Sequence, residues 1–350
     1  MNLKMLSLAL TVGLSAGVAF AQNAVVGYYP YWAQYSQFKP SDVHYERVSQ
    51  IHYSAFSPAA DGSIAFTDES DSPNFDSLVI LSGKNNVSLI AVIGGTETEE
   101  ALASIAADES VRSTFTQNVA ELVSKYNLAG VEIDWQNLTE ENTANYAALI
   151  SALKETLADK IVSASVYSSS ADFYGEALSQ LDQIVVMIGD QMTEESENVQ
   201  PNLKLDDVTA AVEVFASKGV DKSKMIPVVS LTGKSFMGAN GLGTAHQGVG
   251  SGNEGLLSYA ELMKKFDSPD YTVSFDEATS SEVAVGNGET IVFSGIPSVK
   301  AVCNWAKENG LGGVALFDIS QDHAEPIVSL FVTAGLVLRP DVNYAGEKKK

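Results

Sequence analysis

Short runs of apolar and aromatic residues recur along the chain, and each is followed by a turn and then by a helical pattern. Runs that are apolar throughout are typical of strands buried on both faces, as in a parallel sheet covered by helices. Eight such strand–helix units in one chain predict an α/β fold, a closed (β/α)8 TIM barrel. The predicted strands are residues 25–31, 51–56, 88–94, 130–135, 161–167, 183–188, 225–231 and 313–318.

Between several of these runs, apolar residues recur at three- and four-residue spacing. The clearest stripes run through residues 111–126 and 146–157, and further ones through 208–215 and 299–306. This period gathers apolar side chains on one face of a helix. We therefore expect these segments to form helices that cover the outside of the barrel.

The seventh unit breaks this rhythm, because the connection to the last strand is about twice the usual length and contains its own strand-like pieces at 271–275, 281–285 and 290–293. We expect residues 234–297 to form a small α+β insertion between the seventh strand and the seventh helix. It would stand on the C-terminal face, where barrel enzymes keep their active sites. The whole barrel would span residues 22–345, followed by a basic tail at 346–350.

The first 21 residues have the pattern of a secretory signal peptide. Lys4 supplies a positive charge, an apolar stretch follows, and Ala19-Phe20-Ala21 matches a small-x-small cleavage site. The apolar stretch is too short to span a membrane. The pattern resembles a bacterial signal and predicts a secreted or periplasmic protein without a membrane anchor.

Charge and composition narrow the range of partners. The chain carries 44 acidic and 21 basic side chains, a net charge of −23, which disfavours nucleic acid and anionic membranes as partners. Neutral ligands such as sugars remain open. The four histidines are scattered, without cysteine or carboxylate at ligand spacing, so we predict no metal site. The glycine-rich stretch 250–255 lacks the preceding strand that a dinucleotide site needs, and we predict no cofactor.

The sharpest local feature is the alternation of Glu132, Asp134 and Gln136 along the fourth predicted strand. Alternate residues of a strand project to the same face. Three polar groups directed at the helix layer would be costly to bury, so we expect them to point into the barrel. The alternative is an edge strand with one solvated face.

Other polar and aromatic residues end neighbouring strands. Asp190 follows the sixth predicted strand and could meet Asp134 across the barrel; paired carboxylates in a cleft are common in sugar chemistry. A turn or helix-cap role is the alternative for Asp190. Tyr28 and Trp32 end the first strand, where they could stack on a sugar ring or pack under the helices.

Several motifs in order along nearly the whole chain resemble those of glycoside hydrolase family 18, the chitinases and their non-catalytic relatives. They are Gly27-Tyr28-Tyr29, Ile93-Gly94-Gly95, the stretch 129–136 on the signature D-G-x-D-x-D-x-E, the stretch 187–190 on M-x-Y-D, and Leu311-Gly312-Gly313-Val314. The resemblance implies a substrate-assisted mechanism. In it, the last Glu of the signature protonates the glycosidic oxygen, and the N-acetyl carbonyl of the sugar attacks the anomeric carbon.

The chain departs from this pattern where the chemistry takes place. Gln136 stands at the position of the acid, and its amide has no proton to transfer near neutral pH. Ala129 and Glu132 replace the first two Asp of the signature, and Gly189 replaces the Tyr that holds the acetamide. Phe317 stands where the family has a Trp under the sugar.

Asp134, Met187 and Asp190 match the family, and we expect the neutral Gln136 to donate a hydrogen bond to Asp134. We therefore predict an exported, catalytically inactive chitinase-like protein that binds chitin or other N-acetylglucosamine-containing glycans. One alternative is an active or weakly active chitinase or endo-N-acetylglucosaminidase that uses another acid. The other is a protein-binding or inhibitory barrel with a protein partner. The candidates for a substitute acid are Glu132, Glu194 and Glu195.

Overall fold

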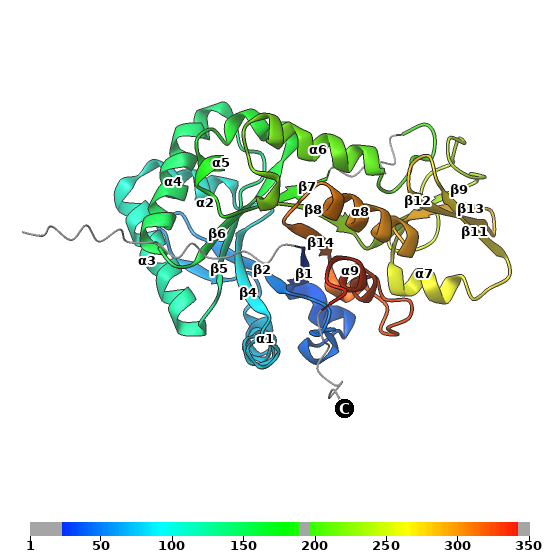
Figure 1. Ribbon diagram of the computed structural model, residues 1–350, viewed down its shortest axis with the longest axis horizontal. Coiled ribbons are helices and arrows are strands. Elements are labelled where there is room, and N and C mark those ends of the chain that lie inside the picture. The colour runs from blue at the N-terminus through cyan, green and yellow to red at the C-terminus, as the bar shows by residue number, and fades with distance from the viewer. Residues whose placement is uncertain (1–22, 189–195, 342–350) are drawn as a thin grey trace, which may run out of the picture.

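Eight parallel strands close into a barrel in the computed structural model, which describes residues 23–188 and 196–341 (Figure 1). Each strand pairs with its neighbours, and the first pairs with both the second and the last, which closes the sheet. The predicted barrel is confirmed. Its strands are β1 (Ala24–Pro30), β2 (Gln50–Pro58), β4 (Ser88–Gly94), β5 (Gly130–Asp134), β6 (Ile161–Tyr167), β7 (Gln183–Met187), β8 (Met225–Ser230) and β14 (Gly313–Phe317). A short strand, β3 (Ile64–Phe66), pairs antiparallel with the end of β2.

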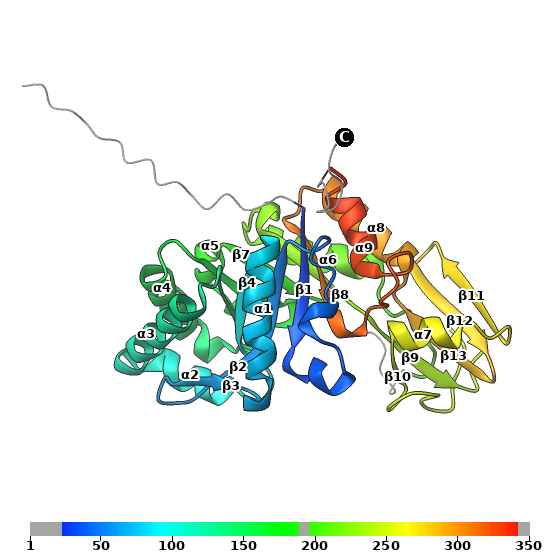
Figure 2. The ribbon, with the colours of Figure 1, turned by 90° about the horizontal axis from the view of Figure 1, so that it is seen from below.

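Helices cover the outside of this barrel (Figures 1 and 2). The helix α3 shows how the sequence sets their limits: the side chain of Asp108 accepts from the N–H groups of Ser110 and Val111 at its start, and Asn127 ends it in the left-handed conformation. The helices are α1 (Ser72–Asn85), α2 (Glu99–Ala107), α3 (Glu109–Tyr126), α4 (Thr143–Thr156), α5 (Ala177–Gln180), α6 (Leu205–Ser217), α8 (Ile296–Glu308) and α9 (Leu330–Leu338).

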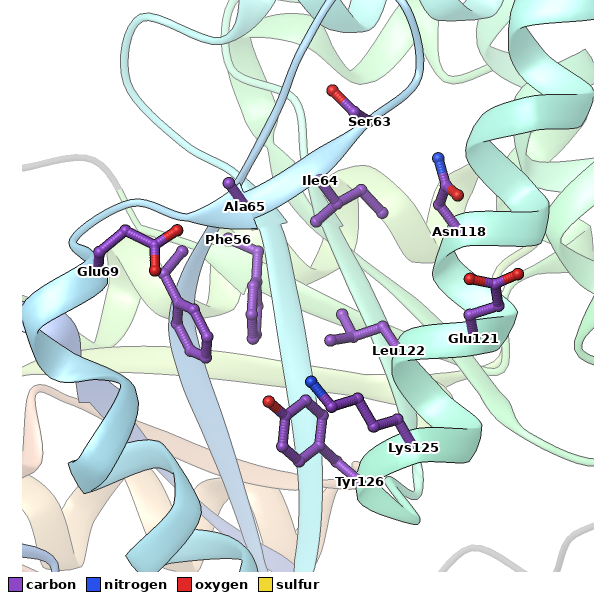
Figure 3. Close-up of a pocket in the computed structure, with 11 residues that line it drawn as sticks. Phe56, Ser63, Ile64, Ala65, Glu69, Asn118, Glu121, Leu122, Lys125 and Tyr126 are labelled. Atoms are coloured by element: carbon purple, nitrogen blue, oxygen red, sulfur yellow. The ribbon is translucent and has the colours of Figure 1, made fainter.

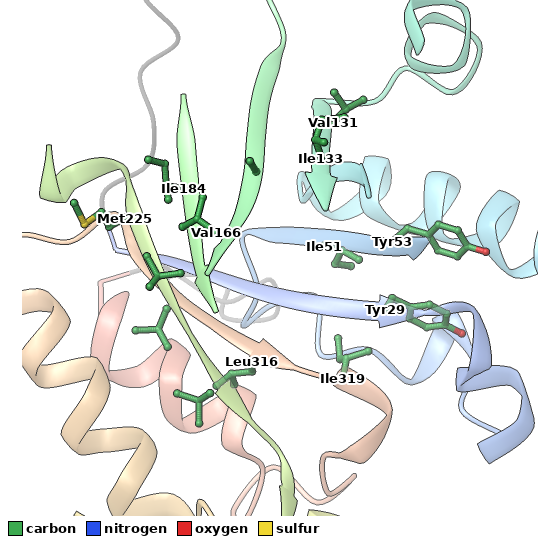
Figure 4. Close-up of a cluster of buried hydrophobic side chains, with 14 of the residues drawn as sticks. Tyr29, Ile51, Tyr53, Val131, Ile133, Val166, Ile184, Met225, Leu316 and Ile319 are labelled. Carbon is green, nitrogen blue, oxygen red and sulfur yellow. The ribbon is translucent and has the colours of Figure 1, made fainter. Parts of the chain in front are cut away.

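The strands bury different side chains on their two faces. Outward-facing residues such as Tyr29, Ile133 and Leu316 pack with the helices into the main core (Figure 4). Inward-facing apolar residues form a separate cluster that includes Val26 and Ile226. Because this interior is largely apolar, each polar side chain inside it needs its own partner.

A second, antiparallel sheet lies beside the barrel, between β8 and α8 in the sequence (Figure 2). Its strand order is β10-β9-β13-β12-β11, and it carries the helix α7 (Tyr259–Lys265). The three strand-like pieces noted in the sequence correspond to β11, β12 and β13. The strands are β9 (Thr232–Met237), β10 (Leu256–Ser258), β11 (Tyr271–Asp276), β12 (Ser281–Gly286) and β13 (Glu289–Phe293).

Some of the sequence predictions fall outside the described residues. These are the signal peptide (1–21), the basic tail (346–350) and Gly189, Asp190, Glu194 and Glu195 between β7 and α6. Within the described part of the chain, no helix combines the length and the apolar character needed to cross a bilayer.

Candidate functional site

A cavity of about 220 Å³ opens at the C-terminal ends of the barrel strands. Each described residue that lines it belongs to a barrel strand or to the segment that follows one, and the second sheet contributes none of them. Six of the predicted site residues meet here. They are Tyr28, Trp32, Asp134, Gln136, Met187 and Phe317.

A larger hollow of about 590 Å³ lies outside the barrel, between the β2–β3 hairpin and α3 (Figure 3). Its charged side chains include Glu121 and Lys125, which are exposed on the surface of α3. None of the predicted site residues lines this hollow. The cavity at the strand ends, with its half-buried carboxylate, is therefore the better candidate for a ligand site.

Glu132 points into the barrel, as the alternation predicts, but it lies beneath the cavity and is fully buried. The hydroxyl of Tyr28 donates to its two oxygens at 2.8 and 3.0 Å, and the hydroxyl of Ser165 donates to Oε1. Nδ1 of His52 lies 2.5 Å from Oε2, and Nε2 of the same ring lies 3.2 Å from Oε1 of Gln50. Glu132 is thus held by side chains from three other strands and does not line the cavity.

Asp134 lies two residues beyond Glu132, at the C-terminal end of β5, and lines the cavity. The hydroxyl of Tyr167 donates to its Oδ1 at 3.0 Å, and the amide of Gln136 donates to its Oδ2 at 3.2 Å. The second contact is the hydrogen bond expected from the sequence. Burial, and after it the charge of Glu132, raises the pKa of Asp134 to about 6.

Aromatic rings form one side of the cavity. The ring of Tyr28 packs against that of Phe317, with ring centroids 5.3 Å apart, and the ring centroids of Trp32 and Phe317 are 6.2 Å apart. Trp32 belongs to the short helix η1 (Tyr31–Ser36), and its indole N–H donates to Oδ2 of Asp318 at 3.3 Å. An aromatic wall beside carboxylate and amide groups is suited to a sugar, which presents both apolar ring faces and hydroxyls.

Three polar members of this arrangement were not predicted from the sequence: His52, Ser165 and Tyr167. All three are inward-facing residues on barrel strands, and His52 occupies such a position on β2. The signal was available in the predicted strands, because a polar residue at an inward position must find a partner. Their partner residues could not be named before the barrel was closed, since the contacts join β2, β5 and β6.

The groups that line the cavity determine which kinds of molecule it can bind. Among residues 23–188 and 196–341, no three His, Cys, Asp or Glu side chains gather so as to hold a metal ion. The cavity presents a hydrogen-bonded carboxylate, an amide, a phenol and aromatic rings. This arrangement can bind a polar, uncharged or cationic molecule. Gln136 contributes an amide, which has no acidic proton to give to a leaving group.

Comparisons with known proteins agree with this architecture. The sequence profile described as glycosyl hydrolases family 18 matches residues 24–322. Chitinase 1 of Aphanocladium album is 24% identical over 376 residues, covering 90% of this chain and 86% of that protein. A chitinase-like effector of Moniliophthora perniciosa is 21% identical over 385 residues, covering 89% and 87%. A plant class V chitinase mutant from Cycas revoluta, solved in complex with (GlcNAc)3, matches with a TM-score of 0.79 and 21% identity over 89% of this chain and 98% of that one.

Proposed function

The chain belongs to glycosyl hydrolase family 18, and on this basis we propose that it is an exported chitinase-like protein that binds chitin or related N-acetylglucosamine glycans without hydrolysing them. The observation that carries the proposal is the pair formed by Gln136 and Asp134. At the position of the acid, an amide donates a hydrogen bond at 3.2 Å to the neighbouring carboxylate. Such an amide can hold a ligand but cannot protonate a leaving group.

The loss of the acid is not compensated by its nearest acidic neighbour. Glu132 is enclosed by Tyr28, Ser165 and His52 below the cavity, so it lies out of reach of a glycosidic oxygen. General acid catalysis contributes about 10²–10⁴-fold to the rate of such reactions. We therefore expect hydrolysis of chitin oligosaccharides to be at least that much slower than in an active family member.

The binding half of the proposal rests on the groups that remain. Tyr28, Trp32 and Phe317 offer an aromatic wall, and Asp134 and Gln136 offer an acceptor and a donor on the opposite side of the same cavity. The related plant protein was solved with (GlcNAc)3, which supports a sugar of this class as ligand. Met187 adds an apolar side chain to the same lining.

The experiment is a calorimetric titration of the protein lacking residues 1–21 with chitotetraose, beside the variants Asp134→Ala and Asp159→Ala. Asp159 is exposed after α4 and serves as the matched control. The proposal predicts saturable binding that is lost in Asp134→Ala and kept in Asp159→Ala. No binding at millimolar sugar would refute it and would favour a protein-binding barrel instead.

A long incubation with the same sugar separates binding from turnover. We expect no release of reducing ends, with an authentic chitinase as positive control. Release that Asp134→Ala abolishes would show a working glycosidase and would contradict the inactive assignment. Export is tested by sequencing the N-terminus of the protein recovered from periplasm or medium, where we expect the chain to begin at Gln22.

A further inference from the structure

The cavity carries a negative charge that no side chain balances among the described residues that line it. Asp134 is the only carboxylate among the described residues that line it, and none of these residues is Lys, Arg or His. The two hydrogen bonds to Asp134 come from a phenol and an amide, which are neutral donors. Neutral donors satisfy the geometry of a carboxylate but leave its charge in place.

The surroundings of Asp134 add to this charge. Its pKa is raised by burial, by the charge of Glu132 and by that of Glu99, while the groups that lower it are Gln136 and Tyr167, both neutral. Asp318, which accepts from the indole N–H of Trp32, is also buried, and its pKa is raised by burial. Because the ring of His52 lies against Glu132 beneath the cavity, the charge that faces the cavity is that of Asp134, and it favours a cation, in keeping with the net charge of −23.

We propose that the site prefers glucosamine units with a free, protonated 2-amino group over N-acetylated units, with the ammonium on Asp134. This inference rests on the proposed carbohydrate-binding function and specifies its ligand class. The ligand is a partly or fully deacetylated glucosamine polymer. Anionic sugars are disfavoured by the same charge.

Asp134 can accept further hydrogen bonds, and an ammonium group can donate them. A carboxylate oxygen has two acceptor sites, and one hydrogen bond is recorded to each oxygen of Asp134. An ammonium brings three donors and a full positive charge, whereas an acetamide brings one neutral N–H. Hydrogen bonds between charged groups are roughly twice as strong as neutral ones. The rings of Trp32 and Phe317, which line the same cavity, also attract a cation.

The experiment compares tetraglucosamine with chitotetraose by calorimetry at about pH 6.5, where well over half of Asp134 is ionised and many of the amines still carry their proton. We expect tetraglucosamine to bind wild-type protein about five- to tenfold more tightly, the factor that corresponds to roughly 1 kcal/mol. The preference should disappear in Asp134→Asn and persist in Asp159→Asn. Added salt should weaken the binding of tetraglucosamine more than the binding of chitotetraose.

A second variant keeps the test decisive if Asp134→Asn is altered in its folding. Gln136→Lys places a cation beside Asp134, so it should abolish the preference for tetraglucosamine. Equal or tighter binding of chitotetraose by wild-type protein would overturn the inference while leaving the proposed function intact. A preference that survives in Asp134→Asn would overturn the role given to this residue. Binding of neither sugar would refute the proposed function itself.

Discussion

The half-buried charge of Asp134 should cost the protein stability, and Asp134→Asn should recover it. The pKa of this carboxyl is raised from 3.8 to about 6 in the folded protein. For a group whose folded pKa is raised, the contribution to stability is complete below the unfolded pKa and is lost as the pH rises through the folded value. Ionised Asp134 therefore disfavours the folded state above about pH 6, and a neutral side chain of the same shape avoids this cost.

The size of the effect follows from the same two values. The difference between 3.8 and about 6 corresponds to about 3 kcal/mol of unfolding free energy at pH 8, and to about half of that at pH 5. Asparagine can still accept from Tyr167, and the amide of Gln136 can turn so that its oxygen faces the new NH2 group. We therefore expect the advantage of Asp134→Asn to grow by about 1.5 kcal/mol between pH 5 and pH 8.

Urea denaturation at pH 5, 6.5 and 8, followed by tryptophan fluorescence, measures this directly. Equal slopes of free energy against urea would show that wild type and variant expose the same surface on unfolding. Asp159→Asn, at an exposed position, controls for the removal of one charge from an acidic protein. An Asp134→Asn advantage that is constant or falls with pH would show that the charge of Asp134 is not destabilising at this half-buried position.

Three further substitutions test the network around this residue. Gln136→Glu replaces the donor to Asp134 with a second acid and should leave thermal stability equal or lower, by about 1–2 kcal/mol at pH 8; a clear gain in melting temperature would contradict the packing described. Tyr167→Phe removes the other donor and should raise the pKa of Asp134 further, which a pH series of sugar affinity would reveal as an upward shift of its acid limb. His52→Ala leaves Glu132 buried without its ring partner and should cost about 2–4 kcal/mol in urea denaturation, and a loss below 0.5 kcal/mol would argue against the buried pair.

Much of the fold could be predicted because buried parallel strands leave uninterrupted apolar runs in the sequence. The alternation of Glu132, Asp134 and Gln136 likewise indicated a common side, since the period of a strand is two residues. The short strands β3, β9 and β10 have no such pattern: β10 has three residues, and β9 contains Gly233 and Lys234 in an otherwise mixed segment. Their pairing depends on the rest of the sheet.

How deep each side chain lies in the barrel could not be predicted from the sequence. Glu132 and Asp134 are two residues apart, yet one is sealed by Tyr28 and His52 and the other lines a cavity. That difference depends on residues about 80 and 104 positions away in the chain. The raised pKa of Asp134 follows from the same long-range packing.

We expect the barrel mouth to bind an amino-sugar chain and to leave it intact. The decisive experiment is a crystal structure of the wild-type protein soaked for days with chitotetraose. The expected result is an uncleaved tetraose against Tyr28, Trp32 and Phe317, with a nitrogen substituent directed at Asp134. A cleaved sugar in the cavity, or a sugar bound elsewhere with the cavity empty, would contradict it.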